Sequence, residues 1–118
     1  MPTILHITSR QAWDDAQEVG HYEAPSLHSQ GYIHCSTQEQ VVGVANIRFK
    51  DHAELVLLCI ESDEVGAEIR YENCEGGTKL FPHVYGQINL GSITNVVPFK
   101  PNPEGVFELP EAVRAMYG

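Results

Sequence analysis

The chain has 118 residues, of which 42% are hydrophobic and 19% are charged, as in an ordinary globular protein. Seven basic residues against sixteen acidic ones give a formal net charge of −9. A field of that sign repels phosphate backbones and anionic lipid, so neither nucleic acid nor a membrane surface is an expected partner.

The N-terminal part of the sequence predicts a strand, a helix and a connection. The strand covers Ile4–Ile7. Ser9 suits the N-cap of a helix that runs to about Glu18, and Gly20 suits its C-terminal stop. The punctuated segment 20–30 is expected to be a loop, either a flap over a binding site or a plain surface connection.

The segment Gly31–Ser36 predicts a short strand that leads directly into a helix. Ser36 and Glu39 have the spacing of a capping box, ahead of apolar residues that predict a helix over residues 37–49. His34 stands two residues before this turn. Strand ends and helix starts gather unpaired backbone amides, so we expect a pocket here.

Strands dominate the second half of the sequence. Leu55–Ile60 is apolar on both faces, which predicts a central strand, and Ala67–Glu72 alternates as a half-buried strand does. In Leu80–Gly86, Pro82 lacks an amide and Gly86 frees the backbone, so we expect a shaped segment and not an interior strand.

The C-terminal part predicts two further strands and a closing helix. Ser92–Val97 is the first strand, residues 98–105 form a proline-rich turn, and Val106–Leu109 is the second strand. Pro110 precedes a helix over Glu111–Tyr117. Without a repeat or a long linker, we expect one compact α+β domain over residues 1–118.

The cysteines are three in number and lack a paired spacing: Cys35, Cys59 and Cys74. This pattern favours reduced thiols in a cytoplasmic protein, with Cys59 packed in the core. The start of the chain lacks the pattern of a signal peptide, and its longest apolar run is too short to span a membrane.

Three histidines stand at strand ends or in the shaped segment, each close to a hydroxyl-bearing residue: His6 with Thr8, His34 with Ser36, and His83 with Tyr85. If they converge, they offer a proton donor or acceptor at neutral pH, with Glu72 as a carboxylate and Tyr32 or Tyr85 to stack on a flat ring. Each residue also has a structural interpretation, as a hydrogen-bonded strand end, a helix cap, a solvated acid or a packing residue.

Metal and thiol chemistry are less favoured by the sequence. It contains no zinc-binding motif, so no metal is expected, although a site built from His6, His34 and His83 stays open as an alternative. Cys35 would need a base beside it to act as a nucleophile, and strand alternation sends His34 to the opposite face.

Four motifs together resemble the signature of domain of unknown function 952, a family of small bacterial and plant proteins: Leu5–Thr8, Gly31–Ser36, Tyr71–Glu72 and Phe81–Gly86. The resemblance implies an ADP-ribosyltransferase-like fold, a split antiparallel β-sheet core with flanking helices around an NAD-binding cleft. It also implies distant similarity to the transferase half of RNA 2′-phosphotransferases.

The resemblance implies roles for individual residues. His6 and Thr8 would orient a ribose, His34 and Ser36 would bind phosphate or ribose or move a proton, and Glu72 would act as the transferase carboxylate. His83 would be the third catalytic residue and would form the other wall of the cleft with Tyr85. Tyr32 and Tyr85 would contact the cofactor.

The expected function is therefore that of an ADP-ribosyltransferase-like domain that binds NAD or a related small molecule in a histidine-lined cleft. Two alternatives stay open. One is a non-catalytic nucleotide-binding module, favoured by Ile7 at a position where such enzymes carry glycine. The other is a metal-dependent hydrolase that uses the three histidines. The sequence names no partner protein.

Overall fold

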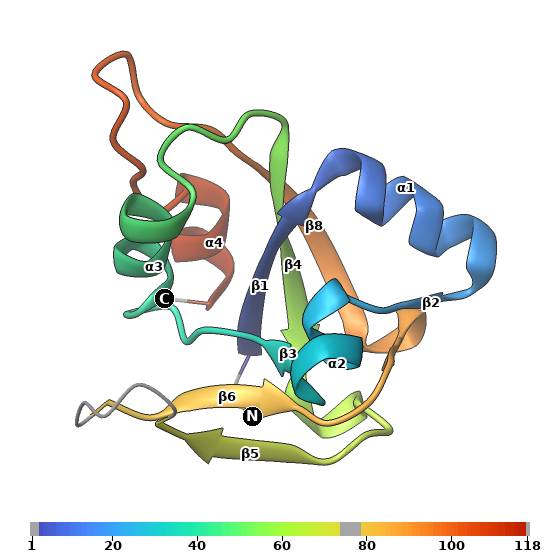
Figure 1. Ribbon diagram of the computed structural model, residues 1–118. Helices are drawn as coiled ribbons and strands as arrows, with labels where there is room; N and C mark the ends of the chain where they lie inside the picture. The colour runs from blue at the N-terminus through green and yellow to red at the C-terminus, as the bar shows by residue number, and fades with distance from the viewer. Residues whose placement is uncertain (1–2, 74–78, 118) are drawn as a thin grey trace.

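Two antiparallel three-stranded sheets meet at the side of strand β1 (Figure 1). One has the order β1 (Thr3–Ser9), β4 (Leu55–Glu61) and β8 (Ile93–Phe99). The other has the order β3 (Ile33–His34), β6 (Phe81–Val84) and β5 (Ile69–Glu72). A two-stranded sheet joins β2 (His21–Tyr22) to β7 (Ile88–Asn89). These elements belong to a computed structural model that describes residues 3–73 and 79–117.

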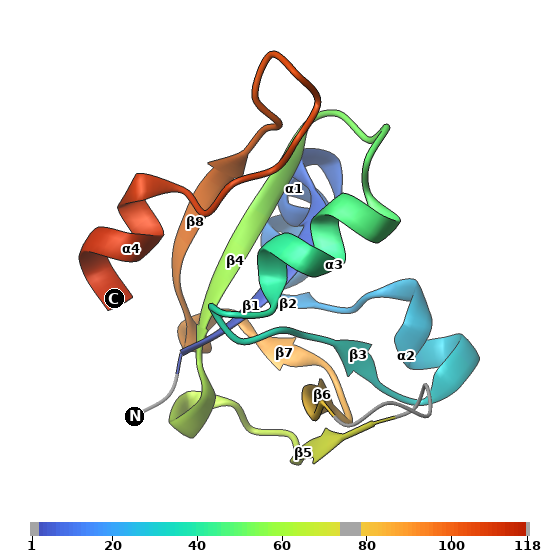
Figure 2. The same ribbon diagram turned by 90° about the vertical axis from the view of Figure 1, so that its left-hand side faces the viewer.

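Among these described residues, four α-helices lie around the sheets: α1 (Arg10–Val19), α2 (Pro25–Gln30), α3 (Val41–Arg48) and α4 (Glu111–Tyr117). Short 3-10 turns follow β4 and β7, at Ser62–Glu64 and Leu90–Ser92. Figures 1 and 2 show α3 and α4 on one face of the β1-β4-β8 sheet and α1 on the other. The predicted α+β class with an antiparallel, divided sheet core is confirmed.

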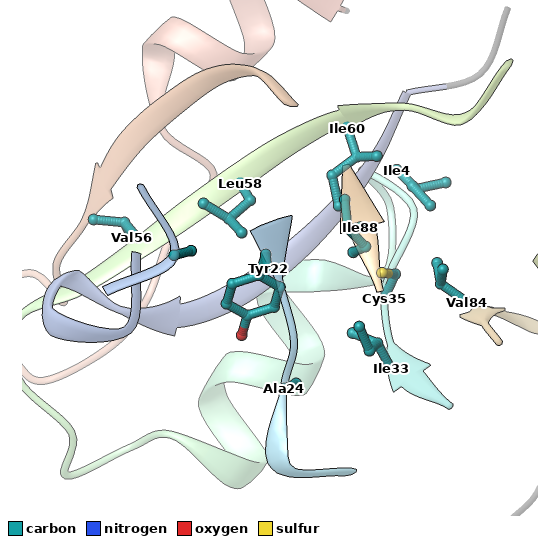
Figure 3. Close-up of a cluster of buried hydrophobic side chains, with 11 residues drawn as sticks. Ile4, Tyr22, Ala24, Ile33, Cys35, Val56, Leu58, Ile60, Val84 and Ile88 are labelled. Carbon is teal, nitrogen blue, oxygen red and sulfur yellow. The ribbon is translucent and has the colours of Figure 1, made fainter. Parts of the chain in front are cut away.

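The core has two halves because β4 buries both of its faces. Leu55, Leu57 and Cys59 pack toward α3 and α4, and none of them is more than 5% exposed. The alternate residues Val56 and Leu58 belong to the buried cluster that includes Ala16 of α1 and Ile33 of the second sheet, and Figure 3 draws this cluster. A strand buried on both sides reads as a continuous apolar run, and this is why the sequence predicted it correctly.

In the part of the chain that the structure describes, one main-chain bridge joins the two large sheets. Leu5 and Ser36 form an isolated antiparallel bridge in which each amide donates to the other residue's carbonyl, over 2.8 and 2.7 Å. The bridge lies directly after β3 and fixes the end of that strand against β1.

Several predicted elements are confirmed with small changes at their ends. β1, β4, β8 and α4 lie where the sequence placed them. Helix α1 begins after Ser9, whose Oγ accepts from the Ala12 amide over 3.0 Å, and it ends at Gly20 with a left-handed φ of 104°. That positive φ is the reason that glycine suits this position. β5 is shorter than predicted and begins at Ile69.

The predicted loop over residues 20–30 is wrong, because this segment holds β2 and α2. Tyr22 pairs with Ile88 and is buried, so it anchors the segment to the body of the protein. Pro25 takes the first position of α2, where its missing amide costs no hydrogen bond.

The predicted capping box between Ser36 and Glu39 does not form, and α3 begins at Val41 and not at Thr37. Ser36 is held by its backbone bridge to Leu5. The Gln40 side chain instead accepts from the Thr37 amide over 3.0 Å, which is half of a capping box one residue further along.

The prediction that Leu80–Gly86 is not an interior strand is also wrong, since β6 is the middle strand of its sheet. The Pro82 carbonyl accepts from the Cys35 amide over 3.0 Å, so the nitrogen and carbonyl of Pro82 face β3. β3 has already ended at His34, and the proline nitrogen falls beyond its last residue. The missing amide therefore interrupts no paired ladder.

The predicted strand Val106–Leu109 is wrong as well, because this segment pairs with no strand in the described residues. The Asn46 side chain takes the place of a partner strand: its Oδ1 accepts from the Phe107 amide and its Nδ2 donates to the Phe107 carbonyl, over 2.8 and 3.2 Å. Phe107 is buried against Phe99, with ring centroids 4.8 Å apart.

Candidate ligand-binding site

A pocket of about 800 Å³ opens at the edge of β1. β1 is an edge strand of its sheet, and the pocket continues past it to α3 on one side and to β2, the start of α2 and the end of β3 on the other. Among its described lining residues there is no aspartate or glutamate, whereas six side chains can carry positive charge: His6, His34, Arg48, His52, Lys79 and His83. In a chain of net charge −9, this is a local reversal of charge.

His6 is buried in the pocket wall, with a partner at each ring nitrogen. Nδ1 lies 2.5 Å from the carbonyl oxygen of His34, which can only accept, so Nδ1 carries the proton. Nε2 lies 2.7 Å from the Tyr22 hydroxyl. Burial lowers the pKa of His6 from 6.5 to about 4, so the ring is neutral near pH 7.

Thr8 continues this hydrogen-bond chain. Side chains two apart on a strand share a face, so Thr8 lies beside His6 and its Oγ1 is 2.9 Å from the Tyr22 hydroxyl. Because the neutral Nε2 of His6 accepts from Tyr22, the Thr8 hydroxyl donates to the Tyr22 oxygen. Burial raises the pKa of Tyr22 to about 12, which keeps its proton in place.

His34 ends β3 and is largely exposed at the pocket wall. Its Nε2 donates to Gln30 Oε1 over 2.5 Å. In the described part of the chain, no group hydrogen-bonds its Nδ1. Partial burial lowers the pKa of His34, and the nearby His83 and Arg48 lower it further.

His83 lies opposite His34 in the β3–β6 register, with ring centroids 5.4 Å apart. It is buried, and its Nδ1 donates to Glu72 Oε1 over 3.1 Å. The same carboxylate oxygen accepts from the Tyr85 hydroxyl. A carboxylate at Nδ1 fixes the tautomer and leaves Nε2 as the basic nitrogen of the neutral ring.

Aromatic and cationic groups surround this histidine on the side of the second sheet. The Tyr32 ring stacks on His83, with centroids 4.3 Å apart and planes 20° apart. The Arg70 guanidinium carbon lies 4.6 Å from the centroid of the Tyr85 ring. The Tyr85 and His83 hydrogen bonds lower the pKa of Glu72, so it is ionised at neutral pH.

The structure brings the predicted site residues together in two groups, one that lines the pocket and one that surrounds His83. His6, Thr8, His34, Ser36 and His83 line the pocket. The other three are not among its lining residues and gather around His83 instead: Tyr32, Glu72 and Tyr85.

Sequence reasoning missed Tyr22, Arg48 and Lys79 in the pocket wall. Helical spacing could have indicated Arg48, because Val44 and Arg48 are four residues apart on α3 and both line the pocket. Tyr22 had no such signal, since its position depends on the pairing of β2 with β7.

No group of three side chains in residues 3–73 and 79–117 is arranged to hold a metal ion. His6 has already committed both ring nitrogens to Tyr22 and to the His34 carbonyl. Cys35 is buried, which raises its pKa to about 12, so it is a poor nucleophile. Cys35 and Cys59 are both thiols, and Cys59 is fully buried as predicted, whereas Cys74 lies outside the described residues.

Comparison with known proteins places this architecture in a family. Residues 7–96 match the family described as "Protein of unknown function (DUF952)". The chain belongs to the DUF952 family. Protein CC0527 from Caulobacter crescentus, solved by X-ray crystallography, is 31% identical and superposes with a TM-score of 0.84 over 95% of this chain and 98% of that one. Its solution NMR structure is 30% identical with a TM-score of 0.79, covering 99% and 98% of the two chains.

Among curated proteins, none matches this DUF952 chain. The family match includes His34, Glu72 and His83 and begins one residue after His6. Among the described residues of this DUF952 chain, no helix has the length and apolar character that crossing a membrane requires.

Proposed function

We propose that the pocket binds an ADP-ribosyl compound, such as NAD or ADP-ribose, and that the domain is a transferase of the ADP-ribosyltransferase-like class. The observation that carries this proposal is the charge of the pocket wall, where Arg48 and Lys79 lie among histidines and no described carboxylate lines the wall. Such a wall favours an anionic ligand, because its positive charges locally offset the repulsion between the ligand and the acidic chain.

The size and chemistry of the pocket suit a nucleotide. Its volume of about 800 Å³ falls within the range of about 300–1,000 Å³ that small-molecule sites occupy. Phe49 and Phe81 supply flat apolar surface for a base, and the hydroxyls of Thr8 and Ser36 supply hydrogen bonds for ribose. Arg48 and Lys79 would pair with the phosphates.

His34 and His83 are the groups that would move protons in this proposal, because both rings line the pocket. Glu72 would act through His83, whose Nδ1 proton it accepts as a hydrogen bond. His6 would shape the ribose site through Tyr22 and Thr8, since both of its ring nitrogens are already engaged.

Two features favour the alternative of a binding module without chemistry. The carboxylate of Glu72 is already bonded to both His83 and Tyr85, and it is not a lining residue of the pocket. His6 is neutral and fully committed. Binding of ADP-ribose and NAD without release of nicotinamide would decide for the module.

Calorimetric titration with ADP-ribose, NAD and AMP, against adenosine as the uncharged control, tests the proposal. We expect ADP-ribose to bind and adenosine to bind at least about tenfold more weakly, because one charge-assisted contact contributes about 1.5–3 kcal/mol. Arg48→Gln and Lys79→Gln should weaken binding, whereas Arg114→Gln and Lys100→Gln, which change cations outside this pocket, should not. Equal binding of adenosine and ADP-ribose would refute the anionic-ligand proposal.

A further inference from the structure

We propose that His34, Arg48 and His83 form a proton-linked anion site, in which a phosphoryl group or similar oxyanion binds together with a proton on His34. This inference deepens the proposed function, because it locates the anionic part of the ligand within the pocket and couples its binding to pH.

The first argument is the composition of the neighbourhood of His34. The ring faces His83 across the β3–β6 ladder, with centroids 5.4 Å apart, and Arg48 on α3 lines the same pocket and lowers the pKa of His34. From α2 the facing group is the neutral amide of Gln30. Potential cations thus approach His34 from two elements, and no described carboxylate lines the same wall.

Glu72 pairs with a member of this cluster, but it is not among the lining residues of the pocket. Glu72, on β5, lies behind His83 and is bonded to Nδ1 of that ring and to the Tyr85 hydroxyl. From β1, His6 faces His34 with a neutral ring whose Nδ1 bonds to the His34 carbonyl. On the pocket side of His34, a bound anion would therefore meet groups that can be cationic and, among the described lining residues, no carboxylate.

The second argument is the hydrogen bonding of His34 itself. Its Nε2–H donates to Gln30 Oε1, so the neutral ring presents a lone pair at Nδ1. Protonation turns Nδ1 into a donor, and in the described residues it has no other hydrogen-bond partner. A proton at this nitrogen thus replaces repulsion of an oxyanion with a charge-assisted hydrogen bond.

Sulfate is a suitable probe, because it stays a dianion between about pH 5 and about pH 8, where histidine titrates. NMR of the histidine rings, with His34→Gln for assignment, gives the pKa of His34 with and without sulfate. An adjacent anion should raise this pKa by about one unit or more, and by linkage sulfate should bind about tenfold more weakly at high pH than at low pH.

Three variants sharpen the test. Arg48→Gln should weaken sulfate binding at every pH, and His34→Gln should remove most of the pH dependence. Arg114→Gln, on the distant helix α4, should change neither. An unchanged His34 pKa in saturating sulfate, or loss of binding in Arg114→Gln, would overturn the inference.

The result separates this inference from the proposed function. Proton-linked sulfate binding in a protein that ignores ADP-ribose would support the anion site and count against the nucleotide. Binding of ADP-ribose that leaves the pKa of His34 unchanged would support the nucleotide and overturn the linked site.

Discussion

The Tyr22 hydroxyl lies 2.7 Å from Nε2 of His6, and both side chains are buried. The contact joins β1 to β2 and places a tyrosine from the segment predicted as a loop in the pocket wall. Figure 3 shows the Tyr22 ring within the apolar cluster, with its oxygen directed away from Leu58.

Tyr22→Phe should destabilise the protein by about 1–3 kcal/mol, since it leaves Nε2 of His6 buried without a donor. Urea unfolding followed by circular dichroism measures this change. The matched control is Tyr71→Phe, because Tyr71 is 44% exposed and its loss of a hydroxyl should cost less than about 0.5 kcal/mol. Equal effects of the two variants would mean that the His6–Tyr22 bond adds no stability.

Stability should fall as the solution is acidified from about pH 7 to about pH 4.5. His6 has a pKa of about 4 when folded against 6.5 when unfolded, so the unfolded chain binds more protons throughout this range. The linked loss is about 2 kcal/mol, and the lowered pKa of His34 acts in the same direction.

Urea unfolding at several pH values checks this slope. Carboxylates whose pKa is lowered, such as Glu72, lose their contribution at more acidic pH, so the range above about pH 4.5 reports mainly on histidines. His6→Gln should be less stable at pH 7 but should show a flatter slope. A variant slope equal to that of the original protein would show that His6 is not the titrating group.

Glu72→Ala should remove the hydrogen bond that holds the proton of His83 on Nδ1. The neutral ring should then be a mixture of its two tautomers. The carboxylate now accepts that proton as a hydrogen bond at 3.1 Å, and its removal takes away the preference for Nδ1. The nitrogen chemical shifts of the ring report the tautomer directly. Glu68→Ala removes the same charge, in the exposed pair with Arg70, and should leave His83 unchanged.

Gly86→Ala should destabilise the protein by about 1–3 kcal/mol, because the new methyl group would lie 2.8 Å from Cβ of Ala67. The double variant Ala67→Gly with Gly86→Ala should recover part of the loss, as expected for residues in contact. Gly43→Ala, in helix α3 with open space around it, should instead be neutral or stabilising by up to about 1 kcal/mol. Additive effects in the double variant would disprove the steric cause.

Sequence patterns predicted the elements whose signals are local. The Ser9 cap, the Gly20 stop and the doubly buried strand β4 each follow from nearby residues. Elements defined by distant partners were missed: β2 depends on β7, and β6 accepts Pro82 only because β3 ends at that point. Asn46 is the clearest case, since an amide 61 residues away replaces the strand predicted beside Phe107.

The candidate site divides in the same way. The histidines were recognisable because strand ends gather function, and His6, His34 and His83 do meet at one pocket. The charge of that pocket was hidden in the sequence, because Arg48 and Lys79 are 31 residues apart and reach the same wall only through folding. Glu72 was found as a residue, but its contact with His83 depends on β5–β6 pairing.

The bridge between Leu5 and Ser36 makes amide hydrogen exchange a measure of motion beside the pocket. Each of these two amides donates to the other residue's carbonyl, at a bridge that joins the two large sheets. Their exchange with deuterium requires the two sheets to separate at this bridge. The exchange rate therefore reports how often the bridge beside the pocket opens. A ligand that contacts both sheets would slow exchange at Leu5 and Ser36 together. The exchange rates of amides in α4, which is remote from the bridge, would stay unchanged.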